Sequence, residues 1–532
     1  MRWWTSDHAR RSRCRGREWL VVACAVCLAV PAAAQTPDSS AVPTEVAASR
    51  AAVMHEAQAS PASASLPSSV ADAPSVAPAS RARPVTSPIS ASAAAQQTPP
   101  PRLPATPRWP LPVQGVPTGP GLGASALPAW LQVHAEQRTR YETMDTRYRP
   151  SETGSDQQLD FRTRLQVRVG GRAGWVYGEV QDARVALDDS GSTVTPAQEN
   201  YTKVLQAFAG RAWQDVGRGR WSFQAEAGRF SRDFGFRRVI ARNIYRNTTN
   251  AYDGAIVRAG RGSWSVQALA VRPVYYTWPD VQRDRRFDRT ALTGLYVTST
   301  ARRAANVDVY ALAWRDGRAM PAGARRVLDT GGARVFGTFG RDGRAEYEVE
   351  AAAQRGQVGP LSHRAWFQHS QAGYNWPSVS WKPRVLLFSD YASGTDPASG
   401  RSGAWDALLG ARRFEFAPVG LYNLLGRSNL NSPGVWLQTR PRGHIDLWVQ
   451  VRGVWLANAR DRWRPVGLGD PTGAAGRHVG TQTEYRVRYR IGRRIELDSG
   501  VVHLVEGRFL RQLGPGRRGR ALFFYSGVDF RY

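Results

Sequence analysis

The last twelve residues of the chain, 521–532, constrain the fold because two kinds of side chain alternate along them. Counting back from the end, every second residue belongs to a mainly apolar set: Tyr532, Phe530, Val528, Ser526, Phe524 and Leu522. The interleaved set carries charge: Arg531, Asp529, Gly527, Tyr525, Phe523 and Ala521. A period of two residues is typical of a β-strand with unlike faces. The segment is therefore predicted to be a strand that ends on an aromatic residue.

The same alternation recurs far upstream. In residues 131–142, 159–169, 346–354 and 484–491, apolar side chains alternate with charged or amide side chains. In a soluble sandwich the charged face would meet the solvent. In a membrane barrel it would face a watery lumen, and the apolar face would meet lipid. The alternation does not choose between these two solvents.

The amino-terminal residues indicate export. Five arginines between positions 10 and 17 precede an apolar run over 19–30, and an Ala-x-Ala site at 32–34 follows. These are the parts of a cleaved signal peptide, predicted as residues 1–34. No other segment reaches the ~18 apolar residues that a spanning helix needs. All three cysteines precede the cleavage site, and a mature chain without cysteine suits an oxidising periplasm.

Residues 35–126 consist largely of Ala, Ser, Pro and Thr. Eighteen of the 34 prolines fall between Pro37 and Pro128, so no continuous helix or sheet can run through this segment, and its composition cannot bury a core. It is predicted to be a disordered periplasmic tether. The third region, 127–532, carries the strand pattern. At roughly 20–24 residues per strand and connection, it predicts an all-β, single-chain antiparallel barrel of about 18 strands, within a range of roughly 16 to 20.

The charge balance points to an anionic partner. The formal net charge is +29. Residues 1–34 hold six arginines and two acids, and residues 35–126 hold five arginines and four acids. The remaining net charge of +24 belongs to the barrel region. Such a charge suits nucleic acid, an anionic membrane surface or an anionic solute. Export excludes nucleic acid, and with the final strand it places the chain in the outer membrane of a Gram-negative bacterium.

Aromatic residues near predicted strand ends would form girdles at the two membrane interfaces. The residues expected there are Trp130, Tyr177, Trp221, Trp264, Trp366, Trp436, Trp448 and Trp455. Loop arginines Arg283, Arg285 and Arg286 are expected to meet lipopolysaccharide phosphates.

Several sequence blocks resemble the alginate export family. They occur in order at 136–142 (EQRTRYE), 161–165 (FRTRL), 179–184 (EVQDAR), 228–254, 390–394 (DYASG), 426–430 (GRSNL), 478–484 and 507–510 (GRFL). The most specific is 229–254, which contains RFSRDFG and RNTTNAYDG. The chain departs from the family's Ser-Gly-Asp at Ser393-Gly394-Thr395-Asp396, and the tether lies outside the family pattern. The resemblance implies an eighteen-stranded barrel whose arginine-lined pore passes a polyuronate outward, with long connections gating each mouth.

Arginine suits the lining of such a pore because it stays charged and binds carboxylates through two hydrogen bonds. The residues predicted to face the lumen are Arg138, Arg140, Arg162, Arg164, Arg229, Arg238, Arg242, Arg486 and Arg488. The acids predicted to hold them in place are Glu136, Glu179, Glu226 and Asp253. For any one arginine the alternative is an ion pair that supports the wall without touching solute.

Two other functions compete with polysaccharide export. A passive anion-selective porin for small solutes would use the same fold. An outer-membrane enzyme would need an activated nucleophile, but the histidines are scattered and no G-x-S-x-G motif occurs, so no catalytic residue is predicted. No cofactor or metal is expected. The expected partners are anionic polysaccharide or small anions, outer-membrane lipid and lipopolysaccharide, the barrel-assembly machinery and periplasmic secretion partners, and the chain is expected to be a monomer.

Overall fold

The computed structural model describes residues 127–532, apart from 149–153, 190–191, 193, 277–284, 287–289, 303, 318–324, 341–342, 414 and 515–518. The predicted signal peptide (1–34) and tether (35–126) lie outside the described residues. So does Arg283, and the side chains of Arg285 and Arg286 are likewise not described.

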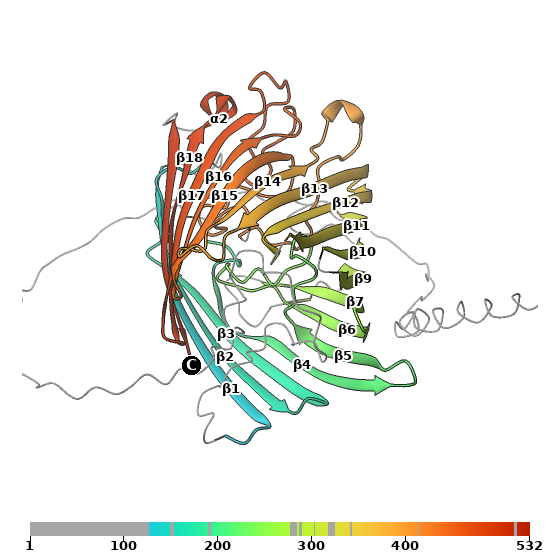
Figure 1. Cartoon of the computed structure of the whole chain (residues 1–532). Coiled ribbons are helices and arrows are strands. Elements are labelled where there is room, and N and C mark those ends of the chain that lie inside the picture. The colour runs from blue at the N-terminus through green and yellow to red at the C-terminus, as the bar shows by residue number, and fades with distance from the viewer. Residues whose placement is uncertain are drawn as a thin grey trace, which may run out of the picture. The chain divides into compact units, whose positions relative to one another are not determined.

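Antiparallel strands make up most of the described chain (Figure 1). Their bounds are β1 (Leu131–Met144), β2 (Asp156–Gly170), β3 (Gly174–Ala186), β4 (Asn200–Val216), β5 (Trp221–Phe230), β6 (Tyr252–Arg261), β7 (Trp264–Tyr275), β8 (Arg285–Arg286), β9 (Thr290–Arg302), β10 (Ala305–Asp316), β11 (Arg326–Phe339), β12 (Ala345–Val358), β13 (Leu361–Asn375), β14 (Arg384–Ala392), β15 (Leu430–Arg442), β16 (Ile445–Trp455), β17 (His478–Ile491), β18 (Ile495–Glu506) and β19 (Arg520–Arg531). The two-residue β8 pairs only with β7. The other eighteen described strands form one closed ring, which confirms the predicted barrel and its strand number.

The first and last strands close the ring. Their register runs from Glu136 opposite Arg531 to Met144 opposite Phe523. The final residue also takes part, because the Tyr532 amide donates to the Ala135 carbonyl at 2.9 Å and the Ala135 amide donates back at 3.1 Å. Closure pairs the backbone groups that an open edge would leave exposed to hydrocarbon. The final strand therefore pairs with the first along most of its length.

Charge lies on the buried face of the strands and apolar side chains lie on the exposed face. On β12, Glu348 and Glu350 are buried, whereas Val349 between them is 44% exposed. This is the reverse of a soluble sandwich and suits lipid outside the ring. Two residues expected in the aromatic girdles, Tyr177 and Trp448, are buried instead. They fall on the same strand face as the polar residues two positions along, so they point away from lipid.

The connections are short at one end of the ring and mostly long at the other. The short ones include residues 171–173, 217–220, 262–263, 443–444 and 492–494, and we call this side the short-turn end. The long ones include 231–251, 393–429 and 456–477. They also include 507–519, which contains α2 (Arg508–Leu513), and the one-turn helix η4 (Pro397–Ser399) lies within 393–429. No helix in the described part of the chain is long and apolar enough to cross a membrane.

Candidate transport pathway

The connection between β5 and β6 (residues 231–251, the β5–β6 loop) crosses the interior of the ring. On one side, Arg162 of β2 donates to its Ile244 carbonyl at 2.8 Å. On the other, its own Arg238 pairs with Glu348 of β12 at 2.5 Å. In the eighteen-strand ring, β2 and β12 are nine strand-to-strand steps apart in either direction. A loop that touches both must run across the lumen, and coil is visible inside the ring in Figure 1.

Arginines of β1 and β2 hold this loop through its backbone. Arg138 donates to the Ile244 carbonyl at 3.2 Å and to the Arg246 carbonyl at 3.1 Å. Arg140 donates to the Tyr245 carbonyl at 2.6 Å. These arginines and Arg162 were predicted to face the lumen. The structure brings them together, and each of them contacts a protein carbonyl.

The connection between β14 and β15 (residues 393–429, the β14–β15 loop) joins the β5–β6 loop. Leu409 and Ile240 form a parallel bridge, in which the Leu409 amide donates to Val239 at 2.9 Å. The Leu409 carbonyl accepts from Ala241 at 3.1 Å. Arg238 adds an ion pair to Glu415 at 2.5 Å. The two loops therefore meet through backbone and side-chain contacts.

The β14–β15 loop also reaches the β17–β19 and β1 side of the wall. Its Arg413 donates to the Tyr525 hydroxyl at 2.6 Å and pairs with Glu484 at 2.7 Å. The Leu421 amide donates to Glu142 at 2.8 Å. Glu142 also accepts from the Tyr245 hydroxyl at 3.2 Å, so one wall carboxylate contacts both loops.

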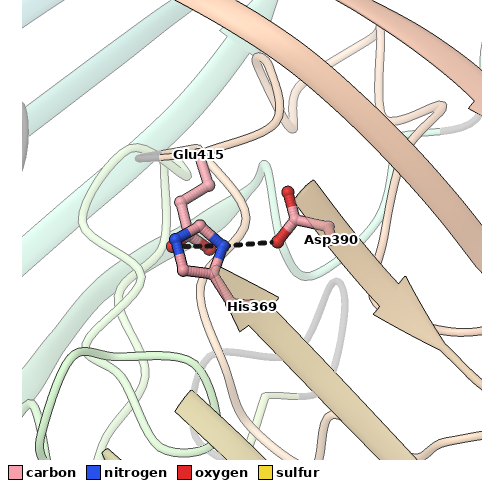
Figure 2. Close-up of side chains that lie close together, drawn as sticks. All are labelled: His369, Asp390 and Glu415. Atoms are coloured by element: carbon pink, nitrogen blue, oxygen red, sulfur yellow. Dashed lines mark hydrogen bonds and ion pairs between the residues drawn. The ribbon is translucent and has the colours of Figure 1, made fainter. Parts of the chain in front are cut away.

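A buried ion network joins the same loop to β13 and β14 (Figure 2). His369 Nδ1 lies 2.8 Å from Asp390 Oδ1 and 3.9 Å from Glu415 Oε1. Ligand atoms of the three side chains fall within 4.8 Å of one another, a spacing that a metal ion would accept. Guanidinium groups already contact the carboxylates, however: Arg452 lies 3.5 Å from Asp390, and Arg238 lies 2.5 Å from Glu415. A divalent cation would have to displace these positive groups, so the arrangement serves better as an ion network.

Most of the other predicted arginines have carboxylate partners. Arg229 forms a bidentate pair with Asp253 at 2.7 and 3.0 Å. The remaining pairs are Arg164 with Glu136 and Glu179, Arg486 with Asp498, and Arg488 with Glu496. Glu226 pairs with Arg232 and Arg258, so each of the four predicted acids contacts arginine.

Arg242 of the β5–β6 loop differs from this pattern. Its Nε donates to the Ser231 hydroxyl at 3.2 Å, and its Nη2 has no hydrogen-bond partner among the described residues. No described carboxylate forms an ion pair with it. Burial lowers the pKa of the Arg242 guanidinium. Binding of an anion would stabilise a buried positive charge that lacks a carboxylate partner.

Sequence reasoning missed several buried arginines. Arg334 of β11 pairs with Asp308 at 2.8 Å and Glu348 at 2.9 Å, and Arg452 of β16 lies beside Asp390. Strand alternation would have found both, because Arg452 is two residues from the buried Gln450. Glu415 and Arg427 lie in a loop without periodicity, and no sequence pattern marks them.

A closed antiparallel barrel with an apolar outer face, a charged inner face and loops folded into its lumen is a channel of the bacterial outer membrane. The sequence matches the alginate export family over residues 129–524, and the chain belongs to that family.

No functionally curated protein matches the sequence. Several solved structures are similar to the chain. Acinetobacter baumannii OccAB2 has a TM-score of 0.50 at 8% identity, covering 76% of this chain and 98% of its own. Pseudomonas aeruginosa OccK3 (OpdO) has a TM-score of 0.47 at 10% identity, covering 76% and 95%. OpdL of the same organism has a TM-score of 0.48 at 12% identity, covering 76% of this chain and 98% of its own. At these identities the likeness concerns the fold alone.

Proposed function

We propose that this barrel exports an anionic polysaccharide of the polyuronate type along an arginine-lined interior. The observation that carries the proposal is the presence of buried guanidinium groups without carboxylate partners. Among the described residues, the Arg138 guanidinium donates only to carbonyl and amide oxygens, and the Arg242 guanidinium donates only to a hydroxyl. Both lie where the β5–β6 loop meets the wall. Membership of the alginate export family supports the same cargo class.

The proposed mechanism involves no bond chemistry. Carboxylates of the polymer would bind weakly at successive guanidinium groups and pass from one to the next. The basic field in a narrow lumen concentrates anions at the entrance. Ion pairs such as Arg229 with Asp253 moderate that field, because a site that bound too tightly would stall the chain.

A passive anion-selective porin is the second candidate, and one observation favours it. The β5–β6 and β14–β15 loops are bonded to each other and to opposite sides of the ring. Loops held in this way narrow the lumen, which suits small solutes. Export of a polymer would require a gap beside the loops or their displacement.

Planar-bilayer recordings distinguish the two candidates. We expect an anion-selective reversal potential, with block by long oligouronates and none by neutral oligosaccharides of equal length. The Arg242→Gln variant should weaken the block, whereas Arg184→Gln should not, because Arg184 lies on the exposed face and pairs with Asp182. Permeation of small anions without block by oligouronates would favour the porin. Cation selectivity would refute both.

The amino-terminal regions also remain proposals. We propose that residues 1–34 direct export and are removed, and that residues 35–126 act as a periplasmic tether. Mass spectrometry of the mature protein tests the first proposal, because it should begin at Gln35.

A further inference from the structure

We propose that the outward face of β4–β7, at the short-turn end, binds the phosphate headgroups of anionic phospholipids. This inference does not depend on the cargo. Its starting point is an aromatic row formed by Trp213, Phe223 and Trp221 on adjacent strands. Trp213 lies directly opposite Phe223, and Trp221 stacks on Phe223 with ring centroids 6.3 Å apart. Trp264 of β7 lies on the same face and is 57% exposed.

One exposed arginine stands at either side of the aromatic row. The Arg211 guanidinium lies 5.3 Å from the Trp213 ring centroid, and that of Arg261 lies 5.9 Å from the Trp221 ring. Neither forms an ion pair with a carboxylate in the described part of the chain. The nearby Arg220 differs, because it pairs with Asp215 at 3.0 Å. Two cations held against aromatic faces therefore keep their hydrogen-bond donors available to an anion.

The depth of these arginines matches a headgroup layer. Arg211 lies opposite Gly174, the first residue of β3, and Arg261 is the last residue of β6. Both therefore lie at the level where hairpins turn, on the end that faces the periplasm in barrels of this type. An outward arginine is costly at the bilayer midplane but costs little near the interface. Tryptophans at this depth anchor in the interfacial layer.

The spacing of the two arginines predicts two lipids rather than one. On the intervening β5, Arg211 lies opposite Ala225 and Arg261 lies opposite Trp221, four residues away. With about 3.3 Å per residue and about 4.8 Å per strand, their Cα atoms are about 16 Å apart. One phosphate cannot easily contact both guanidinium groups at that distance. Each arginine would bind the headgroup of its own lipid, beside a tryptophan that contacts the glycerol and upper acyl region.

Native mass spectrometry of the full chain released from mixed phosphatidylglycerol and phosphatidylcholine nanodiscs tests this site. We expect two phosphatidylglycerol molecules to be retained in preference to phosphatidylcholine. The Arg211→Gln/Arg261→Gln variant should lose roughly tenfold to thirtyfold of that preference. The matched control is Arg493→Gln/Arg494→Gln, which removes the same charge from an exposed turn at the same end and should change the preference less than twofold.

A phosphate competition and a folding check accompany this measurement. Millimolar inorganic phosphate should not displace the lipid, and displacement would assign the site to free phosphate instead. Heat-modifiable gel mobility checks that each variant is folded. If the variant does not fold, the wild-type protein alone still tests the proposal. A wild-type protein that retains phosphatidylcholine as well as phosphatidylglycerol would overturn it. Equal losses in the variant and the control would also overturn it, because they would reflect net charge alone.

Discussion

Arg238 pairs with Glu348 at 2.5 Å, and this contact fastens the β5–β6 loop to β12. The same guanidinium contacts Glu350 and Glu415, so one side chain joins two strand carboxylates to the second inward loop. All of these groups are buried. Breaking a buried ion pair from one side costs about 3–5 kcal/mol because the remaining charge stays desolvated. The position of both loops therefore depends strongly on Arg238.

The Arg238→Gln variant should loosen the loops within the barrel. We expect a larger or more frequently switching single-channel conductance, measured in planar bilayers. Arg486→Gln is the control, because Arg486 pairs with Asp498 on the wall and forms no hydrogen bond or ion pair with either loop in the described part of the chain. Unchanged currents in Arg238→Gln, or equal changes in both variants, would contradict this assignment.

Glu415→Gln should act through the same contact as Arg238→Gln. Each variant alone is expected to destabilise the folded barrel, and the double variant should cost less than the sum by about 1–3 kcal/mol. Urea unfolding in lipid vesicles, followed by tryptophan fluorescence, measures the cycle. Additive losses would show that the two residues act independently.

Tyr525→Phe removes one hydroxyl that accepts from Arg413 at 2.6 Å. Arg413 keeps its ion pair with Glu484, so the expected loss is about 0.5–1.5 kcal/mol of unfolding free energy. Arg413→Gln should cost more, because it leaves the buried Glu484 without that partner. Equilibrium unfolding of the two variants side by side checks this order, and the reverse order would refute it.

The depth dependence of the outer face can be tested on a single strand. Val309 of β10 is 51% exposed near the middle of the strand, and we expect Val309→Arg to cost about 2–4 kcal/mol. Ala305→Arg, at the first residue of β10, should cost only about 0–1 kcal/mol. Unfolding from vesicles gives both values. Equal costs would mean that the exposed face of β10 does not meet hydrocarbon.

The alternation of side chains was enough to predict the strands, and together with the export signal and the final strand it predicted the closed barrel. This information is local, because a period of two residues records which face of a strand meets lipid. It also placed Glu136 and Arg162 on the same face, where the structure finds them paired at 2.7 Å. The girdle expectation was wrong for Tyr177 and Trp448, because the alternation places both on the inward face.

The amino-acid sequence by itself determined the fold, because strand periodicity and the apolar outer face depend on neighbours one or two residues apart. Only the tertiary structure decided what the interior charges contact. Arg238 meets Glu348 and Glu415 across sequence separations of 110 and 177 residues, through loops that have no periodicity. Closure of the ring brings these groups together. Burial favours a partner for each of these charges, and several arginines predicted to face the lumen also contact the loops.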